Sequence, residues 1–244
     1  MLSFFYLFYS IFGWIVCTIA FSTHMLVVLI FAPFVKDPIG FNIACTRPII
    51  RCALWILRIQ VHVEHADYIP TDQSFIIVAN HQSHVDIPAI LLAIPRPFGF
   101  IAKKELLNVP IVGWVIRSQG HIAIDRSNPV QAKNQLEALV SSIASNQKNL
   151  VIFAEGTRSA TGKLGKFKIG AFDLAAKSGA MIIPASISGS FGVLSKRSME
   201  MRPGTITIRF SPPVHTPKSA TRRELEQVRI DVVTAISESM SRNV

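Results

Sequence analysis

The first 35 residues contain no Asp, Glu, Lys or Arg, and this apolar run restricts the possible folds more than any other feature of the chain. About 20 helical residues are enough to cross a hydrocarbon core of about 30 Å. The run can form one long tilted helix, or two segments broken near residues 22–24, the second being interfacial or re-entrant. A signal peptide is the alternative, but its charged n-region is missing. We therefore expect an N-terminal hydrophobic membrane-anchoring helical segment.

Positive side chains follow this segment, and none precedes it. They are Lys36, Arg47, Arg51 and Arg58. The positive-inside tendency therefore places the rest of the chain on the cytoplasmic side of the membrane, which in a bacterium is the inner membrane. Residues 41–62 mix arginines with apolar residues, which is typical of a basic amphipathic helix on a membrane surface. We expect residues 1–62 to form the membrane anchor and interfacial helices, and residues 63–244 to form one larger domain.

The formal net charge of +10 fits nucleic acid, an anionic membrane or an anionic substrate as partner. Nucleic acid is disfavoured, because the N-terminus suits a membrane and no nucleic-acid-binding motif occurs. Each Lys or Arg near an anionic leaflet contributes about 1 kcal/mol to membrane binding. The alternative is a solvated basic surface, and part of the charge must be of that kind. We expect membrane lipids as partners, and no nucleic acid.

Short apolar runs typical of strands alternate with helical periods from about residue 70 onward. The expected strands are residues 75–79, 98–102, 121–124, 150–154, 181–188 and 205–210. Asn128 and Pro129 favour a helix start before an apolar pattern of helical spacing. Thr221 and Glu224 have the spacing of a capping box at the start of the last helix. The alternation predicts an α/β fold with a mostly parallel, twisted sheet flanked by helices.

Polar clusters come directly after four of these runs, at residues 80–86, 103–104, 125–126 and 155–158. In open α/β sheets, ligands bind in the crevice beyond the carboxyl ends of the strands. We therefore expect the four clusters to converge on one rim and to form one site.

The first cluster, Asn-His-Gln-Ser-His-Val-Asp at 80–86, contains a possible catalytic pair. His81 and Asp86 are about 140° apart on an ideal helix, so they do not share a face of one continuous helix. They meet if His81 lies in a loop and the helix begins after it, with Ser83 as N-cap and Asp86 in the first turn. A carboxylate on one ring nitrogen leaves the other free to act as a base. The alternative is that Asp86 is only an imperfect capping-box partner of Ser83.

The cluster Glu155, Gly156, Thr157 and Arg158 is suited to holding a phosphate monoester. Gly156 allows the backbone to approach a ligand closely, the turn supplies N–H groups, and Arg158 supplies a guanidinium. The alternative is an ordinary strand-to-loop turn with a surface ion pair.

Two further cations are candidate substrate ligands. Arg126 follows the run 121–124 and would add a second cation for a phosphate, unless it forms only a surface pair with Asp125. Lys103, next to Lys104, either contacts the ligand or belongs to a basic rim that faces the membrane.

The chain lacks a recognisable protein nucleophile. No Gly-x-Ser-x-Gly elbow occurs, and neither Cys45 nor Cys52 lies in a motif of an activated thiolate. A His–Asp pair without a nucleophile indicates that the base activates a substrate hydroxyl directly. A metal-dependent hydrolase would instead use His81, His84 and Asp86 as ligands, but the other histidines follow no metal spacing, and we expect no metal.

Together these clusters resemble the glycerolipid acyltransferase family, whose best-known members are 1-acyl-sn-glycerol-3-phosphate acyltransferases. Its four blocks occur in order, as His-x4-Asp within 80–86, Gly-x-x-x-Ile-Asp-Arg at 120–126, Glu-Gly-Thr-Arg-Ser at 155–159 and a proline-containing apolar run at 182–185. The resemblance covers about residues 60–215. Two positions depart from the family pattern, since Ala154 stands where Pro is usual and Ala123 where a bulky residue is usual.

The resemblance implies that residues 63–244 form an acyltransferase domain. His81 would deprotonate the sn-2 hydroxyl of lysophosphatidic acid as it attacks an acyl thioester, with Asp86 orienting His81. Arg126 and the 155–158 turn would hold the glycerol phosphate, and phosphatidic acid would enter phospholipid biosynthesis. Acyl-CoA or acyl-carrier protein would be the donor substrate, and no cofactor is expected.

The acceptor stays open within the family, because the same blocks serve enzymes that acylate another lysolipid or an aminolipid. Two other hypotheses are a metal-dependent hydrolase and a non-catalytic membrane scaffold. The intact set of His81, Asp86, Glu155 and Arg158 disfavours the scaffold.

Overall fold

The apolar N-terminal run forms one uninterrupted helix, α1 (Leu2–Phe31), in the computed structural model. At about 1.5 Å per residue, α1 is about 45 Å long, which exceeds the hydrocarbon core of about 30 Å. Among the residues that the structure describes, α1 is the one helix long and apolar enough to cross a membrane, and the rest of the chain buries only 11% of its most apolar window. Of the two arrangements left open by the sequence, the structure contains the single long helix, and residues 22–24 lie inside it.

The structure describes residues 2–31, 34–109, 113, 114, 116, 121–124 and 129–242. The helices are α1, α2 (Pro38–Ile56), α3 (Asp86–Ala93), α5 (Pro129–Ala144), α6 (Gly170–Ser178), α7 (Ser190–Val193) and α8 (Arg222–Ser241), with the 3-10 helices η2 (Ala66–Tyr68) and η3 (Lys104–Asn108). The strands are β1 (Ile59–Glu64), β2 (Phe75–Ala79), β3 (Gly99–Lys103), β4 (Ile122–Ile124), β5 (Leu150–Phe153), β6 (Met181–Ser188) and β7 (Gly204–Phe210).

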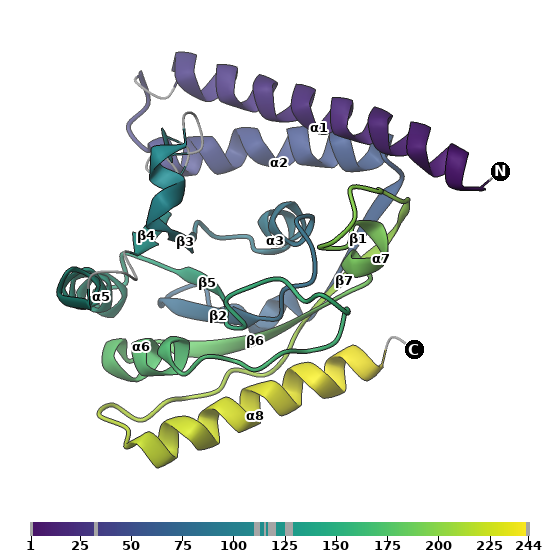
Figure 1. The fold of residues 1–244 in the computed structure, drawn as a ribbon. Coiled ribbons are helices and arrows are strands. Elements are labelled where there is room, and N and C mark those ends of the chain that lie inside the picture. Colours follow the sequence, from purple (N-terminus) through teal and green to yellow (C-terminus); the bar gives the residue numbers. More distant parts are fainter. Residues whose placement is uncertain are drawn as a thin grey trace.

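These strands form one sheet in the order β1-β7-β6-β2-β5-β3-β4 (Figure 1). β2, β3, β4, β5 and β6 run parallel to one another, and β1 runs parallel to β7. β6 and β7 are antiparallel, so the pair β1–β7 runs opposite to the rest of the sheet. The predicted mostly parallel sheet is therefore confirmed, and each of the six predicted strands occurs with bounds shifted by at most one residue.

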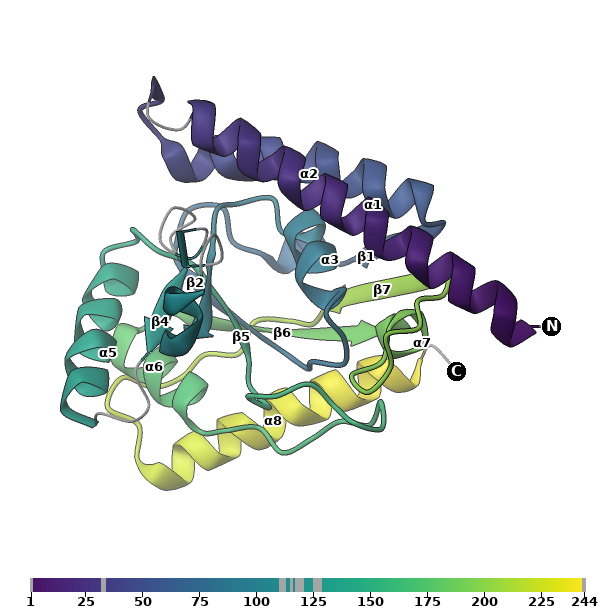
Figure 2. The ribbon, with the colours of Figure 1, turned by 45° about the horizontal axis from the view of Figure 1, so that its top comes forward.

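The central strand β2 shows how the sequence divides the core into two layers. All of its side chains are fully buried, and successive residues of a strand point to opposite faces. Phe75 and Ile77 pack on the side of α3, and Ile76 and Val78 pack on the side of α5, α6 and α8. Figure 2 shows the resulting layers, with α1 and α2 lying side by side above α3 and with α8 on the opposite face of the sheet.

The segment after α2 departs from the sequence prediction. α2 begins with Asp37 as N-cap, whose side chain accepts the Gly40 N–H at 2.9 Å, and it ends at Ile56. The prediction that the helix extends to residue 62 is wrong, because β1 begins at Ile59 and pairs with β7. The expected boundary between residues 62 and 63 therefore falls inside β1.

The sequence predicted the starts of two helices, α5 and α8. The capping box of α8 is confirmed, since the Thr221 side chain accepts the Glu224 N–H and the Glu224 side chain accepts the Thr221 N–H. α5 has Pro129 as its first residue, and Asn128 lies outside the described residues.

Candidate active site

The site begins where β2 and β5 end together. The last residues of the two strands, Ala79 and Phe153, are partners in the parallel register, and the Ala154 N–H donates to the Ala79 carbonyl at 3.2 Å. The polar segments that follow, 80–86 and 154–158, therefore leave the same edge of the sheet next to each other. The predicted convergence is confirmed for these two clusters.

His81 and Asp86 form the predicted side-chain pair. The Nδ1 atom of His81 lies 2.7 Å from Oδ2 of Asp86, whose side chain is fully buried, while 14% of the His81 side chain is exposed. With Nδ1 donating to the carboxylate, the lone pair of the imidazole is on Nε2. Nε2 has no hydrogen-bond partner among the described residues, and it is therefore available to accept a proton.

The loop that carries His81 is folded around the Asp86 carboxylate. Besides the imidazole, Oδ2 accepts the backbone N–H of Gln82 at 2.7 Å and of Ser83 at 2.8 Å. The prediction of Ser83 as the N-cap is wrong, because α3 begins at Asp86 and the residue before it, Val85, has the cap position. The Ser83 hydroxyl donates instead to the Leu194 carbonyl at 2.5 Å, and Asp86 itself satisfies the free N–H groups before the helix.

An aromatic ring fixes the plane of the imidazole. The ring of Phe153, the last residue of β5, stacks on His81 with a centroid distance of 4.0 Å and an interplanar angle of 13°. Phe100 of β3 stacks in turn on Phe153, with a centroid distance of 5.8 Å and an interplanar angle of 11°. The Asp86 contact and the stack together leave the imidazole little rotational freedom.

Glu155 holds the backbone of His81. Its Oε1 accepts the His81 N–H at 2.8 Å, and its Oε2 accepts the Gly165 N–H at 3.0 Å. The His81 carbonyl accepts the Ser159 N–H at 2.7 Å, so the segment after β5 holds both backbone groups of His81. Burial raises the pKa of the Glu155 carboxyl, and the two backbone N–H groups oppose this rise. The structure gives Glu155 a positioning role, and its predicted contact with substrate stays a prediction.

The turn after Glu155 gathers cationic side chains. Gly156 has φ +72°, and a Cβ atom there would lie 2.6 Å from Nζ of Lys168, so the Lys168 ammonium lies directly over the glycine. Lys196 donates through Nζ to the Thr157 hydroxyl at 2.9 Å and to the Arg158 carbonyl at 3.0 Å. The turn therefore combines a glycine, a hydroxyl and positive charges in the segment that also holds the backbone of His81.

The pKa of His84, which lies in the same loop as His81, is affected by Arg158. Burial lowers the pKa of His84, and the positive charge of Arg158 lowers it further, followed by the effect of His81. The nearby Asp86 acts in the opposite direction. The positive charge of Arg158 therefore acts on His84, which neighbours the His81–Asp86 pair in the sequence.

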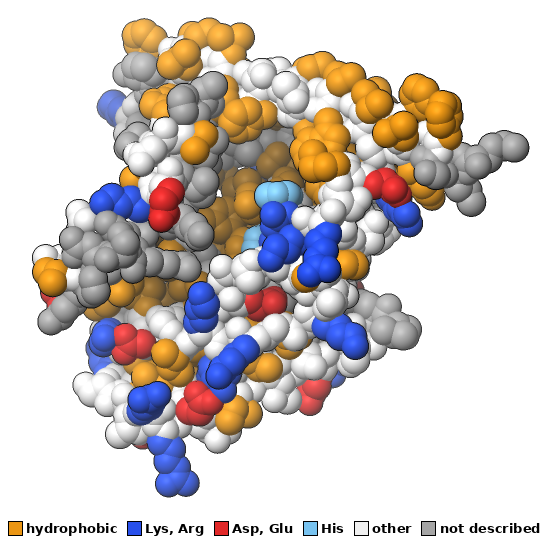
Figure 3. Space-filling view, viewed as in Figure 1, with side chains coloured by type: hydrophobic (Ala, Val, Ile, Leu, Met, Phe, Trp, Pro, Cys, Tyr) orange, Lys and Arg blue, Asp and Glu red, His pale blue; other side chains and the backbone are white. Residues whose placement is uncertain are grey.

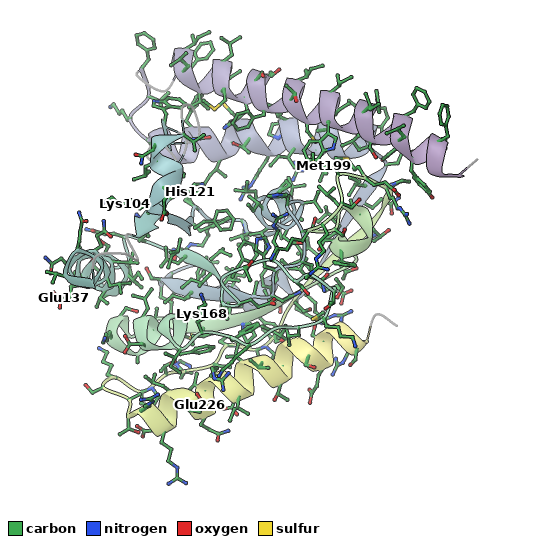
Figure 4. The ribbon with its side chains drawn as sticks, viewed as in Figure 1. Lys104, His121, Glu137, Lys168, Met199 and Glu226 are labelled. Carbon is green, nitrogen blue, oxygen red and sulfur yellow. The ribbon has the colours of Figure 1, made fainter. Side chains whose placement is uncertain are left out.

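The remaining predicted ligands lie on the β3–β4 side. Arg126 lies outside the described residues. Lys103 is the last residue of β3, and its side chain is not among those described. Lys104 donates to the Gln131 side chain of α5 at 3.3 Å, and Figure 4 shows it with His121 at the end of the molecule that carries β3, β4 and α5. The predicted substrate contacts of Arg126 and Lys103 stay predictions.

A hollow opens between the membrane-side helices and the sheet. Figure 3 shows it below α1 and α2, with walls of apolar side chains, histidine side chains inside it, and Lys and Arg side chains beside them. Such a hollow suits an amphiphile whose acyl chain contacts the walls and whose anionic head contacts the cations.

The arrangement can transfer a proton between His81 and a substrate hydroxyl while nearby cations hold an anionic group. No group of three or more His, Cys, Asp and Glu side chains suited to a metal ion occurs among the residues that the structure describes.

Several residues with a role in this geometry were missed by sequence reasoning. Asn80 donates to the Ile187 carbonyl at 2.9 Å and accepts the Ile187 N–H at 2.7 Å, which ties the start of the His81 loop to β6. Phe153 and Lys196 were missed as well. Phe153 directly precedes the Glu155 cluster, a position that could have suggested its role, whereas nothing in the sequence near Lys196 points to the turn at Thr157.

Comparisons with known proteins identify the relatives of this chain. The family model described as Acyltransferase matches residues 60–188. The 1-acyl-sn-glycerol-3-phosphate acyltransferase of Cocos nucifera is 34% identical over 166 residues, which are 68% of this chain and 53% of that protein. The corresponding alpha enzyme of Mus musculus is 31% identical over 176 residues, which are 72% of this chain and 62% of that protein. This chain therefore spans between half and two thirds of the length of these relatives.

A solved structure covers nearly the whole chain. The crystal structure of the 1-acyl-sn-glycerophosphate (LPA) acyltransferase PlsC from Thermotoga maritima aligns with a TM-score of 0.79 and 27% identity, over 98% of each chain. Because the family model covers more than half of the sequence and contains the His81–Asp86 and Glu155–Arg158 segments, the chain belongs to the acyltransferase family.

Proposed function

We propose that this chain is an acyltransferase that moves a fatty acyl group from a thioester to the sn-2 hydroxyl of lysophosphatidic acid and so forms phosphatidic acid. The observation that carries the proposal is the His81–Asp86 pair, with Nδ1 held at 2.7 Å and Nε2 free, beside the cationic turn at 156–158. The names of the relatives and of the Thermotoga maritima structure support lysophosphatidic acid as the acceptor.

The proposed reaction proceeds in one addition and one elimination. Nε2 of His81 takes the proton of the acceptor hydroxyl as its oxygen bonds to the thioester carbonyl carbon. The C–S bond then breaks and the thiolate leaves, and the imidazolium returns its proton to the thiolate or to water. A thiol has a pKa near 8.5, so it leaves without a strong general acid. Asp86 stabilises the imidazolium that forms in between.

The head group would bind at the turn that follows β5. The cations Arg158, Lys168 and Lys196 lie on or next to residues 156–158, where a phosphate monoester can accept charge-assisted hydrogen bonds. Arg126 and Lys103 would add to this charge from the neighbouring strands. The acyl chains would contact the apolar walls of the hollow in Figure 3.

The donor is acyl-CoA or acyl-carrier protein in this proposal, and no cofactor takes part. Chemistry by His81 alone requires nothing beyond a thioester and a hydroxyl. The proposal places the catalytic domain on the cytoplasmic side of the membrane, which the positive residues after α1 support. In vesicles of known sidedness, added protease should cleave the chain beyond α1 only when the cytoplasmic face is outside.

The decisive assay uses the purified chain in neutral detergent micelles, with palmitoyl-CoA or palmitoyl-acyl-carrier protein and a panel of acceptors. We expect phosphatidic acid, identified by mass spectrometry, with one free thiol released per molecule formed. Preferential acylation of another lysolipid or of an aminolipid would replace the acceptor and keep the reaction class. Release of free fatty acid without transfer, with loss of activity on chelation, would instead support a metal-dependent hydrolase. An absence of turnover with every acceptor would support the scaffold hypothesis.

A further inference from the structure

Besides the hollow that contains the histidines, the structure has a basic groove between the end of α2 and the edge strand β1. It has a volume of about 950 Å³ and is lined by side chains of α2, β1, the end of α3 and the start of β7. None of the lining residues belongs to segments 80–86 or 153–159, so the groove is separate from the His81 site. Figure 1 shows the chain turning from α2 down into β1 below the N-terminal half of α1.

The charge of this groove is entirely positive. Arg51 and Arg58 line it, and no Asp or Glu is among the lining residues. Both arginines are exposed, and neither has an ion pair or a side-chain hydrogen bond within the described part of the chain. Two such guanidinium groups in one groove can bind a phosphate through several charge-assisted hydrogen bonds.

The part of α2 that lines the groove also exposes a tryptophan. Trp55 follows Arg51 by one helical turn, so the two lie on one face of α2, and Arg58 lines the same groove just beyond the end of the helix. The Trp55 side chain is 80% exposed although it lines the groove. Tryptophan is enriched at the boundary between head groups and acyl chains, where its ring is apolar and its N–H is polar.

The backbone at Arg58 turns the chain from α2 into β1. Arg58 has φ +47°, in the left-handed region where glycine is the usual residue after a helix. Its N–H donates to the Trp55 carbonyl at 3.0 Å, and its carbonyl accepts the Gly204 N–H at 3.3 Å. This turn places Arg58 among the residues that line the groove.

The position of the groove next to α1 indicates where its ligand comes from. The Tyr9 hydroxyl of α1 donates to the Leu57 carbonyl at the end of α2, so the groove adjoins the helix that is suited to a membrane. β1 is an edge strand whose backbone groups on the free side have no strand partner among the described residues. Gln60 on this strand adds a polar side chain to the lining.

We propose that this groove binds the head group of an acidic membrane phospholipid, separately from the substrate site at His81. Arg51 and Arg58 contact the lipid phosphate, Trp55 lies at the level of the glycerol backbone, and the free edge of β1 offers hydrogen bonds to polar groups of the head. The site thereby sets the depth and orientation of the chain on an anionic membrane. This proposal does not depend on the acyl-transfer reaction.

The test uses the full chain in phosphatidylcholine nanodiscs that contain a small fraction of phosphatidylglycerol with brominated acyl chains. Bromine quenches tryptophan over short distances, and the difference between the wild type and Trp55→Phe isolates the emission of Trp55. We expect brominated phosphatidylglycerol to quench Trp55 at least about fivefold more effectively than the same amount of brominated phosphatidylcholine, since each arginine near an anionic lipid contributes about that factor.

The double variant R51Q/R58Q should lose this preference, while R51K/R58K should retain part of it. The matched control is R222Q/R223Q on α8, which removes the same charge from the opposite face of the sheet and should keep the preference. Equal quenching by the two lipids in the wild type, an unchanged preference in R51Q/R58Q, or equal loss in R222Q/R223Q would each overturn the proposal. R51Q/R58Q should keep its rate of acyl transfer in neutral micelles within about twofold of the wild-type rate. This result would show that the variant is folded.

Discussion

Glu155 accepts the backbone N–H of His81 at 2.8 Å, so the segment after β5 determines where the imidazole after β2 lies. The carboxylate uses its other oxygen for the Gly165 N–H at 3.0 Å, and a Cβ atom on Gly165 would lie 2.5 Å from that oxygen. A residue expected to bind substrate therefore joins two loops around His81, the proposed general base. The next predictions test this role separately from substrate binding.

Replacing Glu155 by glutamine should reduce turnover more than binding. A glutamine presents one acceptor and one donor, so one of the two backbone N–H groups of His81 and Gly165 is left facing an NH₂ group. An unsatisfied buried donor costs about 1–3 kcal/mol, and we expect kcat to fall by about 10- to 100-fold. The KM for lysophosphatidic acid should change by less than about threefold. Steady-state kinetics of Glu155→Gln, with the exposed Glu238→Gln as control, measure this; a changed KM with normal kcat would indicate a direct substrate contact instead.

The raised pKa of Glu155 predicts a specific dependence of stability on pH. Between the usual value of 4.5 and its raised pKa, the folded state keeps a proton that the unfolded state has released. The free energy of unfolding should therefore fall as the pH rises through this window, and it should level off above the raised pKa. Because glutamine does not titrate, Glu155→Gln should lack this contribution. Urea unfolding of both proteins in detergent at several pH values measures the difference, and a difference that increases with pH would contradict the assignment.

Removing the ring of Phe153 should slow turnover by loosening the imidazole. A stacked aromatic pair contributes about 0.5–1.5 kcal/mol beyond its buried area, so Phe153→Leu should lower kcat by about 2- to 10-fold. Phe153→Tyr keeps the ring and should stay close to the wild type. Measuring kcat for both variants decides the point, and equal effects of leucine and tyrosine would mean that the stack does not position His81.

Lys196 should act on the phosphorylated acceptor and not on the donor. It donates to the Thr157 hydroxyl at 2.9 Å and to the Arg158 carbonyl at 3.0 Å, so its loss releases the turn that is proposed to hold the phosphate. We expect Lys196→Met to raise the KM for lysophosphatidic acid by about tenfold, the factor expected for one charge-assisted contact, and to leave the KM for acyl-CoA unchanged. Lys196→Arg should restore part of the affinity, and Lys218→Met serves as a control for the loss of one charge. Equal changes in both KM values would argue for a general loss of structure.

The sequence predicted much of this architecture because its strong signals are local. The strand runs, the uncharged α1 and the Thr221–Glu224 capping box each depend on neighbouring residues, and the structure contains all of them. β1 was missed although the sequence Ile-Gln-Val-His-Val-Glu alternates apolar and polar residues, because the basic pattern of α2 was extended across it. The left-handed Arg58 separates the two elements, and an arginine gives no sign of such a turn in the sequence.

The contact between His81 and Asp86 was predictable from the sequence, whereas the residues that hold His81 in place were not. His81 and Asp86 are only five positions apart, so their meeting requires a loop followed by a helix start. The contacts of His81 with Phe153 and Glu155 join residues more than 70 positions apart, and the pairing of β2 with β5 creates them. Ser83 was assigned as the N-cap by local rules, but α3 begins later, at Asp86, and Val85 has the cap position. The Asp86 carboxylate instead accepts the Ser83 N–H while it holds the imidazole.

The turnover number of His81→Ala with lysophosphatidic acid and acyl-CoA tests the proposed role of His81 as general base most directly. We expect kcat to fall by about 10²- to 10⁴-fold, the range typical for loss of a general base, with a melting temperature close to that of the wild type. The exposed His215→Ala should keep full activity under the same conditions. A His81→Ala protein that is folded and turns over near the wild-type rate would contradict the account.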